Sequence, residues 1–424
     1  MTNFIKRFLN ILYKILFGYS LGARMKSFLR ELSWSMISGI ISALLTFLVM
    51  IMAAKVLGPA EFGKYNYITS FAVFLAFFCL LGADAGSVRF LASKDRFADR
   101  GKYFSASLTL VVLQTFILIV CLNVLQLVYP GLLGIPTQML YLVECLILTY
   151  AFKNQFENYL RAFRKIKIQS ALRISSSLLS VILFLIFYTI GGNNSYIYLV
   201  YMFIGSYLLF PVFGFAALKK NLCYFSFSHL WEISKYNLIF SIGLIGGLLL
   251  SLEKFFIGEF LGLTTLGQYS YYYISTFLVI SALGSNFMNV FWPEAIRSGD
   301  QLTHVSQKMA LLLTKLFPLW FVVSIFLSWL LFLFERAFGF PLFLIFLLSI
   351  VSFMLFSFNV FIALLNIKLV KIGAAISLSN AIVAVAILLI LKSLSLYLIC
   401  QIILYFISII FIMKLIKNDK SKKE

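Results

Sequence analysis

The sequence predicts an all-α integral membrane protein, with twelve transmembrane helices in two six-helix bundles related by a pseudo-twofold axis along the membrane normal. Three observations predict this fold. The 424 residues are 62% hydrophobic and 12% charged, whereas charged residues make up about a quarter of a soluble domain. Apolar runs long enough to cross a bilayer recur along the chain. A short motif also repeats at half the chain length.

The apolar runs are each close to the ~20 residues that a helix needs to cross the hydrocarbon core of a bilayer. The predicted spans are 33–54, 66–86, 104–129, 137–159, 169–190, 196–218, 237–260, 268–293, 309–334, 339–365, 371–391 and 394–415. Six spans therefore fall in each half of the chain.

The repeated motif reads L-G-x-x-x-x-G-x-Y. It occupies residues 57–65 and again residues 261–269, 204 positions later, and each copy follows the first span of its half. A tight turn between two apolar runs needs glycine. The predicted turn residues are Gly58, Gly63, Tyr65, Gly262, Gly267 and Tyr269. Because an even number of spans gives both halves the same orientation, we expect the substrate path between them.

The positive charges indicate how the chain lies in the membrane. Of the 35 Lys and Arg residues, 27 lie in the terminal segments and in alternate connections, which predicts that both termini are cytoplasmic. In a soluble protein the net charge of +20 would suggest a nucleic-acid partner. Here the positive charges are distributed as membrane orientation requires, and this accounts for the net charge. We therefore expect contacts with membrane lipids and none with nucleic acid.

The predicted domains follow from these boundaries. They are an interfacial N-terminal helix over 1–32, a first bundle over 33–218, a cytoplasmic linker over 219–236, a second bundle over 237–415 and a basic cytoplasmic tail over 416–424. The N-terminal segment is amphipathic, with apolar residues on one stripe and Lys6 and Lys14 on another, which favours a helix on the membrane surface over a disordered basic leader.

Several kinds of site are excluded. The five cysteines form no C-x-x-C pair, and the two histidines lie in polar connections, so we predict no metal, disulfide or cofactor. Residues 58–64 imitate a phosphate-binding loop, but Tyr65 replaces the Ser or Thr that would hold Mg²⁺. No connection is long enough for a catalytic domain, which disfavours a glycan polymerase or ligase. The chain is therefore predicted to be a transporter and not an enzyme.

Charged residues inside the predicted spans are the candidate functional groups, because a charge in the bilayer is costly and usually faces a cavity or a partner. They are Asp84, Glu144, Lys153, Glu157, Arg173, Glu253, Lys254, Glu259 and Lys315. Lys153 and Glu157 are one helical turn apart and can pair on one face. A path lined by cations at two depths would be suited to an anionic head group.

Simpler interpretations stay open for several of these residues. Glu157 and Arg173 can also be interfacial side chains that reach toward the head groups. Glu253 and Lys254 can form a structural ion pair between helices. Asp84 can pair with Arg89 near the end of the second span.

The chain also resembles a known family. The motif residues of 57–65, the segment Val88-Arg89-Phe90-Leu91-Ala92 after Asp84, and Glu253-Lys254-x-x-Ile257-Gly258 before the second motif resemble bacterial polysaccharide flippases of the Wzx type. These belong to the multidrug/oligosaccharidyl-lipid/polysaccharide exporter superfamily. Glu253 is a departure, because this family more often has Asp before the basic residue.

The resemblance implies a flippase in the bacterial cytoplasmic (inner) membrane. Its substrate would be an oligosaccharide repeat unit linked to undecaprenyl diphosphate, of an O-antigen, a capsule or a similar glycan, moved from the inner to the outer leaflet by alternating access. A glycan polymerase and a chain-length regulator would be its protein partners. The alternative is a cation-coupled multidrug antiporter of the same superfamily.

The expected roles divide the charged residues by sign. The cations expected to attract the substrate are Lys254, Lys153, Arg173 and Arg89. The acids expected to set the polarity of the cavity, or to couple transport to H⁺ or Na⁺, are Glu253, Glu144, Glu157 and Asp84.

Overall fold

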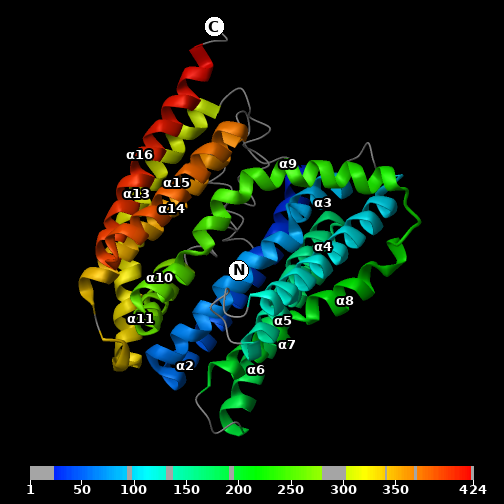
Figure 1. Ribbon diagram of the computed structural model, residues 1–424. Helices are drawn as coiled ribbons and strands as arrows, with labels where there is room; N and C mark the ends of the chain where they lie inside the picture. The colour runs from blue at the N-terminus through cyan, green and yellow to red at the C-terminus, as the bar shows by residue number, and fades with distance from the viewer. Residues whose placement is uncertain are drawn as a thin grey trace.

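The computed structural model describes residues 23–92, 98–129, 137–190, 195–278, 302–339, 341–366 and 370–421. Every regular element within these residues is a helix (Figure 1). The predicted all-α class is therefore confirmed for this part of the chain. Most of the predicted N-terminal interfacial helix lies outside the described residues, which begin at Ala23.

The described residues of the first half form seven α-helices. They are α2 (Ala23–Leu80), α3 (Ala83–Ala92), α4 (Arg100–Val128), α5 (Thr137–Ala162), α6 (Ile166–Ile190), α7 (Tyr196–Tyr207) and α8 (Leu209–Leu218). A short 3₁₀ turn, η1 (Lys219–Asn221), leads into the second half.

The second half contains α9 (Phe227–Ser251), α10 (Glu253–Leu261), α11 (Leu263–Tyr273), α13 (Leu302–Phe334), α14 (Leu342–Asn366), α15 (Val370–Leu391) and α16 (Leu394–Ser421). A π-helical segment, η2 (Ile274–Leu278), continues α11, and a 3₁₀ turn, η4 (Arg336–Phe338), follows α13.

Seven described helices are long and apolar enough to cross a membrane. One of them, Ser33–Leu80, has 48 residues. At 1.5 Å per residue it would be roughly 70 Å long, more than twice the ~30 Å of a hydrocarbon core. It must therefore be divided, and the break lies at Gly58. The finer arrangement of twelve spans stays a prediction, since residues 279–301 fall outside the described part and α5 is less apolar than predicted.

The outer faces of the helices carry large apolar side chains. On α4, Phe116 is 64% exposed, and on α13 Val322 is 63% exposed. Surfaces of this kind are rare on soluble proteins and are expected where lipid covers the helix.

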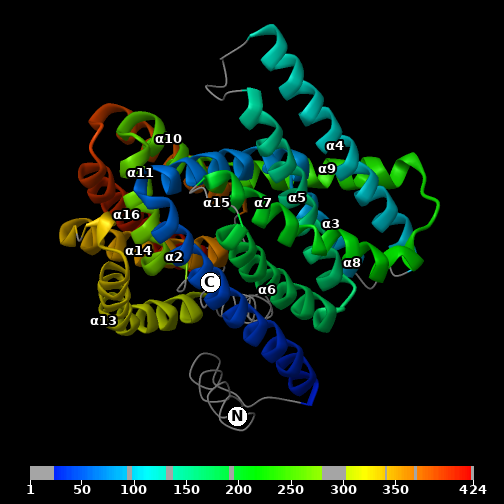
Figure 2. The same ribbon diagram turned by 90° about the horizontal axis from the view of Figure 1, so that it is seen from below.

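The helices form two groups that are joined at both ends (Figure 1). Helices α3 to α8 gather on one side and α13 to α16 on the other, while α9 connects the groups at the end that carries the C-terminus. Toward the other end, α2 passes beside α10 and α11. Figure 2 shows the same neighbours from below.

The first repeated turn breaks α2 within one residue. Gly58 has φ +71° and ψ 175°, outside the helical region, and Pro59 starts the next arm of the helix. Gly262 between α10 and α11 has nearly the same conformation, with φ +90° and ψ 158°. Positive φ favours glycine, so the backbone of both motif copies turns at a glycine.

The two turns also pack directly on each other. A Cβ atom added to Gly63 would lie 1.9 Å from the carbonyl oxygen of Leu263, and one added to Gly267 would lie 1.9 Å from the carbonyl oxygen of Pro59. With the offset of 204, Gly63 corresponds to Gly267 and Pro59 to Leu263. Each copy thus touches the other through the same pair of positions, as in a twofold-related contact. We call the surface formed by residues 55–71 of α2 with residues 253–273 of α10 and α11 the turn interface.

The predicted linker is bound to the first half. Tyr103 Oη of α4 donates a hydrogen bond of 2.6 Å to Glu232 Oε2 of α9, and the Cys223 amide donates one of 2.9 Å to Ser105 Oγ. Farther along, α9 packs extensively against α15. The predicted linker is therefore partly helical, and α9 connects the two groups as one helix.

We expect Gly63→Ala and Gly267→Ala to destabilise the protein, because each added methyl group meets a backbone carbonyl that cannot rotate away. Overpacking of this kind costs about 1–3 kcal/mol per site. Thermal unfolding in detergent should show a lower midpoint for each variant. Thr264→Ala, at an exposed position of the same turn, is the control. Unchanged midpoints for both glycine variants would contradict the reciprocal contact.

Candidate functional site

A carboxylate surrounded by hydroxyl and amide groups lies at the start of α10. Glu253 Oε1 accepts a hydrogen bond of 2.6 Å from Tyr269 Oη, and the polar groups of Tyr397 and Gln401 of α16 lie beside the same carboxylate. Gln401 Nε2 also donates to Tyr397 Oη at 2.5 Å. The three partners are at most 2% exposed. The carboxylate is thus held in place by neutral donors.

Lys254 makes different contacts. Its ammonium lies 3.5 Å from Asn66 Oδ1 of α2 and 4.6 Å from the centre of the Tyr273 ring. Asn66 Nδ2 donates to the Phe62 carbonyl at 2.8 Å, which orients the amide oxygen toward Lys254. Neither Glu253 nor Lys254 forms an ion pair with another described residue. The alternative of an ion pair made by these two residues is therefore not supported in the described part.

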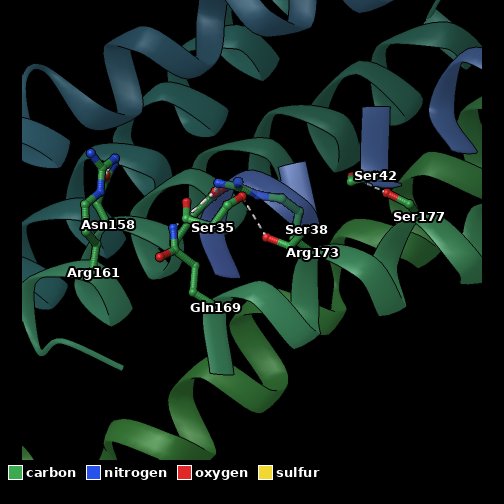
Figure 3. A network of polar contacts seen from close by, with 9 residues as sticks. Ser35, Ser38, Ser42, Asn158, Arg161, Gln169, Arg173 and Ser177 are labelled. Carbon is green, nitrogen blue, oxygen red and sulfur yellow. Dashed lines mark hydrogen bonds and ion pairs between the residues drawn. The ribbon is translucent and has the colours of Figure 1, made fainter. Parts of the chain in front are cut away.

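A second cluster lies in the first half, between α5 and α6. Arg173 forms an ion pair with Glu157, and Gln169 Nε2 donates to the same carboxylate at 3.3 Å. The Arg173 and Glu157 side chains are 25% and 17% exposed. Figure 3 shows Arg173 and Gln169 beside Ser35 and Ser38 of α2.

The predicted pairing of Lys153 with Glu157 is wrong as a direct contact. The Lys153 ammonium lies 4.6 Å from the centre of the Tyr207 ring and 5.8 Å from that of Tyr150. Glu157 of α5 pairs instead with Arg173 of α6. The planar guanidinium fits a carboxylate better than an ammonium does. Lys153 therefore lies on aromatic faces, as Lys254 does.

The remaining predicted acids and cations are not brought to these clusters within the described residues. Glu144 Oε1 accepts a hydrogen bond of 2.6 Å from Asn123 Nδ2, and the neighbouring Asn123 and Cys145 are exposed, which places Glu144 on an outer surface between α4 and α5. Asp84 and Arg89 belong to α3, but their side chains lie outside the described part.

The two motif tyrosines have different roles. Tyr269 binds Glu253, whereas Tyr65 is 6% exposed and stacks on Phe203 with ring centres 5.8 Å apart. The offset of 204 pairs Glu253 with Val49, which is a buried core residue. The first copy therefore has a tyrosine at the same place but no carboxylate for it to bind.

Sequence reasoning missed the neutral residues of both clusters. Gln401 could have been found, because it is an amide inside the apolar run 394–415. Asn66 directly follows the first motif copy. Tyr207 and Tyr397 have no distinguishing signal among 22 tyrosines.

The groups at these clusters can bind charged ligands. Among the described residues, no three His, Cys, Asp or Glu side chains come together as they would around a metal ion. Ammonium groups on tyrosine faces can bind anions such as phosphate, and tyrosine faces can stack on sugar rings. Carboxylates held by neutral donors can bind H⁺ or a small cation.

The fold is that of membrane transporters. Over 93% of this chain and 97% of the other, it matches MATE in complex with MaL6, with a TM-score of 0.66 and 15% identity. A MOP superfamily transporter from Pyrococcus furiosus matches with a TM-score of 0.66 and 14% identity, over 92% of this chain and 95% of the other. Its binding pocket is described as having reversed polarity. A multidrug resistance MATE transporter in an inward-facing conformation matches with a TM-score of 0.64 and 15% identity, over 90% of this chain and 96% of the other. The chain therefore shares the fold of these multi-pass transporters.

The family follows from the sequence itself. The model of the family described as "Polysaccharide biosynthesis protein" matches residues 28–298, and the chain belongs to this family. The resemblance to polysaccharide flippases is thereby confirmed. No curated protein matches the chain.

We expect Arg173→Met to lower stability, because it leaves the Glu157 carboxylate half-buried without its cation. Losing one partner of a buried pair costs up to about 3–5 kcal/mol, and less at the partial exposure seen here. The double variant Glu157→Leu with Arg173→Met should regain most of the unfolding midpoint in detergent. If the double variant is no more stable than Arg173→Met alone, the ion pair is not the stabilising contact.

Proposed function

We propose that this protein is a flippase that moves an undecaprenyl-diphosphate-linked oligosaccharide repeat unit from the inner to the outer leaflet of the bacterial cytoplasmic membrane. Membership of the polysaccharide biosynthesis family supports the substrate class. The observation that carries the proposal is the environment of Lys254 and Lys153. Each ammonium lies on a tyrosine ring, and neither forms an ion pair with a described carboxylate. Such cations are available to an anionic substrate.

The diphosphate is the part of the substrate that these cations would hold. Its negative charge is fixed at neutral pH, and hydrogen bonds from ammonium to phosphate are about twice as strong as neutral ones. Arg173 would contribute when the substrate displaces its contact with Glu157, and Arg89 of α3 is a further candidate.

The transport cycle we propose is alternating access between the bundles 33–218 and 237–415. In this cycle the termini are cytoplasmic, and the turn interface lies toward the external side, where it would close the path. Coupling to H⁺ or Na⁺ through Glu253 is part of this proposal, with Tyr269, Tyr397 and Gln401 as the groups that hold the carboxylate. A glycan polymerase and a chain-length regulator would receive the product outside.

A cation-coupled multidrug antiporter is the second candidate. The similarity to MATE structures favours it, as does the presence of Glu253. Against it, Glu157 is already paired with Arg173, and the Lys254 and Lys153 ammonium groups would repel a cationic drug. Increased drug resistance on overexpression, with normal glycan export in a deletion strain, would favour this candidate instead.

The direct test locates the lipid-linked oligosaccharide in cells that lack the protein. Leaflet-specific labelling should find it accumulated on the cytoplasmic face, and the intact chain should restore it to the outer face. Normal delivery to the outer face without the protein would contradict the flippase proposal.

Variants of the two available cations should separate binding from folding. We expect Lys254→Ala and Lys153→Ala each to reduce surface glycan at least about tenfold at unchanged protein level, since a charge-assisted hydrogen bond to substrate contributes roughly 1.5–3 kcal/mol. Lys392→Ala, at an exposed connection, should leave surface glycan unchanged. Normal surface glycan with both Lys254→Ala and Lys153→Ala would show that these ammonium groups do not bind the substrate.

A further inference from the structure

The turn interface contains a polar contact that joins the two halves beside the candidate site. Lys254 of α10 reaches Asn66 of α2, and three residues of the same surface reinforce this region. Tyr67 stacks on Phe255 with ring centres 4.7 Å apart, and Tyr67 Oη donates to Glu259 Oε2 at 3.1 Å. One residue, Lys254, is thus both a candidate substrate cation and a contact between the halves.

The contact between Lys254 and Asn66 is weak by its geometry and its chemistry. At 3.5 Å it is longer than the usual 2.7–3.2 Å of such bonds, and its acceptor is a neutral amide oxygen. An anionic oxygen attracts an ammonium more strongly than an amide does. A phosphate that reaches Lys254 would therefore displace Asn66.

Comparison of the two repeat copies shows that the contact between Lys254 and Asn66 occurs once and has no equivalent at the corresponding positions. With the offset of 204, Asn66 corresponds to Ser270 and Lys254 to Met50. The glycine contacts of the turn interface are reciprocal, but the second copy of the polar contact is absent. Close packing thus holds the turns together symmetrically, while a single ammonium adds a contact that a ligand can remove.

We propose that Asn66 is a positioning residue that holds the Lys254 ammonium across the turn interface until an anionic group of the substrate replaces it. Binding of the anion and loosening of the turn interface are then one event, because the same ammonium serves both. The identity of the anion as a diphosphate rests on the proposed function, whereas the contact between the halves does not.

The opening of the turn interface can be measured with a reporter variant, Ser270→Cys. Ser270 is 0% exposed and lies three residues after Gly267 on α11, on the face that packs against α2. The substitution is nearly isosteric, and a soluble maleimide should reach the new thiol only when the halves separate. The native cysteines Cys79, Cys121, Cys145, Cys223 and Cys400 are replaced by serine. Thr264→Cys, exposed in the same turn, reports unrestricted labelling.

The decisive variant is Asn66→Asp in the purified Ser270→Cys reporter. A carboxylate at this position pairs with Lys254, so maleimide labelling at position 270 should slow about fivefold, equivalent to about 1 kcal/mol. Adding Lys254→Met should abolish this slowing, because no cation is left to pair; methionine already occupies the equivalent position 50. Labelling of the Thr264→Cys control should not change. Unchanged labelling with Asn66→Asp, or slowing that persists with Lys254→Met, would overturn the proposal.

The ligand step is tested on the same reporter with geranylgeranyl diphosphate. Labelling at position 270 should accelerate in the parent reporter and stay constant with Lys254→Met. If the diphosphate has no effect while Asn66→Asp still slows labelling through Lys254, the displacement step is overturned and the contact between the halves stands. The leaflet assay does not depend on either labelling result. A failure of the proposed function can therefore be distinguished from a failure of the contact between Asn66 and Lys254.

Discussion

The close packing of two glycine turns is the constraint on which the rest of the structure depends. Gly63 lies against the Leu263 carbonyl and Gly267 against the Pro59 carbonyl, with no room for a side chain at either position. Because α2 and α11 meet at backbone distance there, the residues that follow on each helix are fixed relative to the opposite half. Asn66 comes within reach of Lys254 and Tyr67 within reach of Glu259 one helical turn beyond Gly63.

The repeat preserves the scaffold and not the chemistry. Gly58 and Gly262 keep nearly the same backbone conformation, and the glycine contacts are reciprocal. Glu253 and Lys254 have apolar counterparts in the first copy, where Val49 and Met50 stand at the equivalent positions. A symmetric contact can thus hold two halves together while the charges beside it are asymmetric.

The sequence predicted those features of the structure that depend on residues close together in the chain. Glycine at positive φ, apolar runs and the repeat are local features, and the turns, the helical class and the family followed from them. The pairing of Glu157 was misjudged because helical spacing identifies neighbours on one helix only, whereas Arg173 approaches from α6. Tyr397 and Gln401 were not predicted because more than a hundred residues separate them from Glu253, and only the folded chain brings them together.

The two kinds of charged contact have different consequences inside a membrane protein. Arg173 and Glu157 satisfy each other, so their charges largely cancel and the pair joins α5 to α6. Lys254 and Lys153 contact ring faces, and Lys254 also an amide, while neither forms an ion pair within the described residues. An uncancelled cation keeps its attraction for an anion that arrives later. The absence of an ion pair at these lysines, within the described residues, is therefore the feature on which their proposed binding role depends.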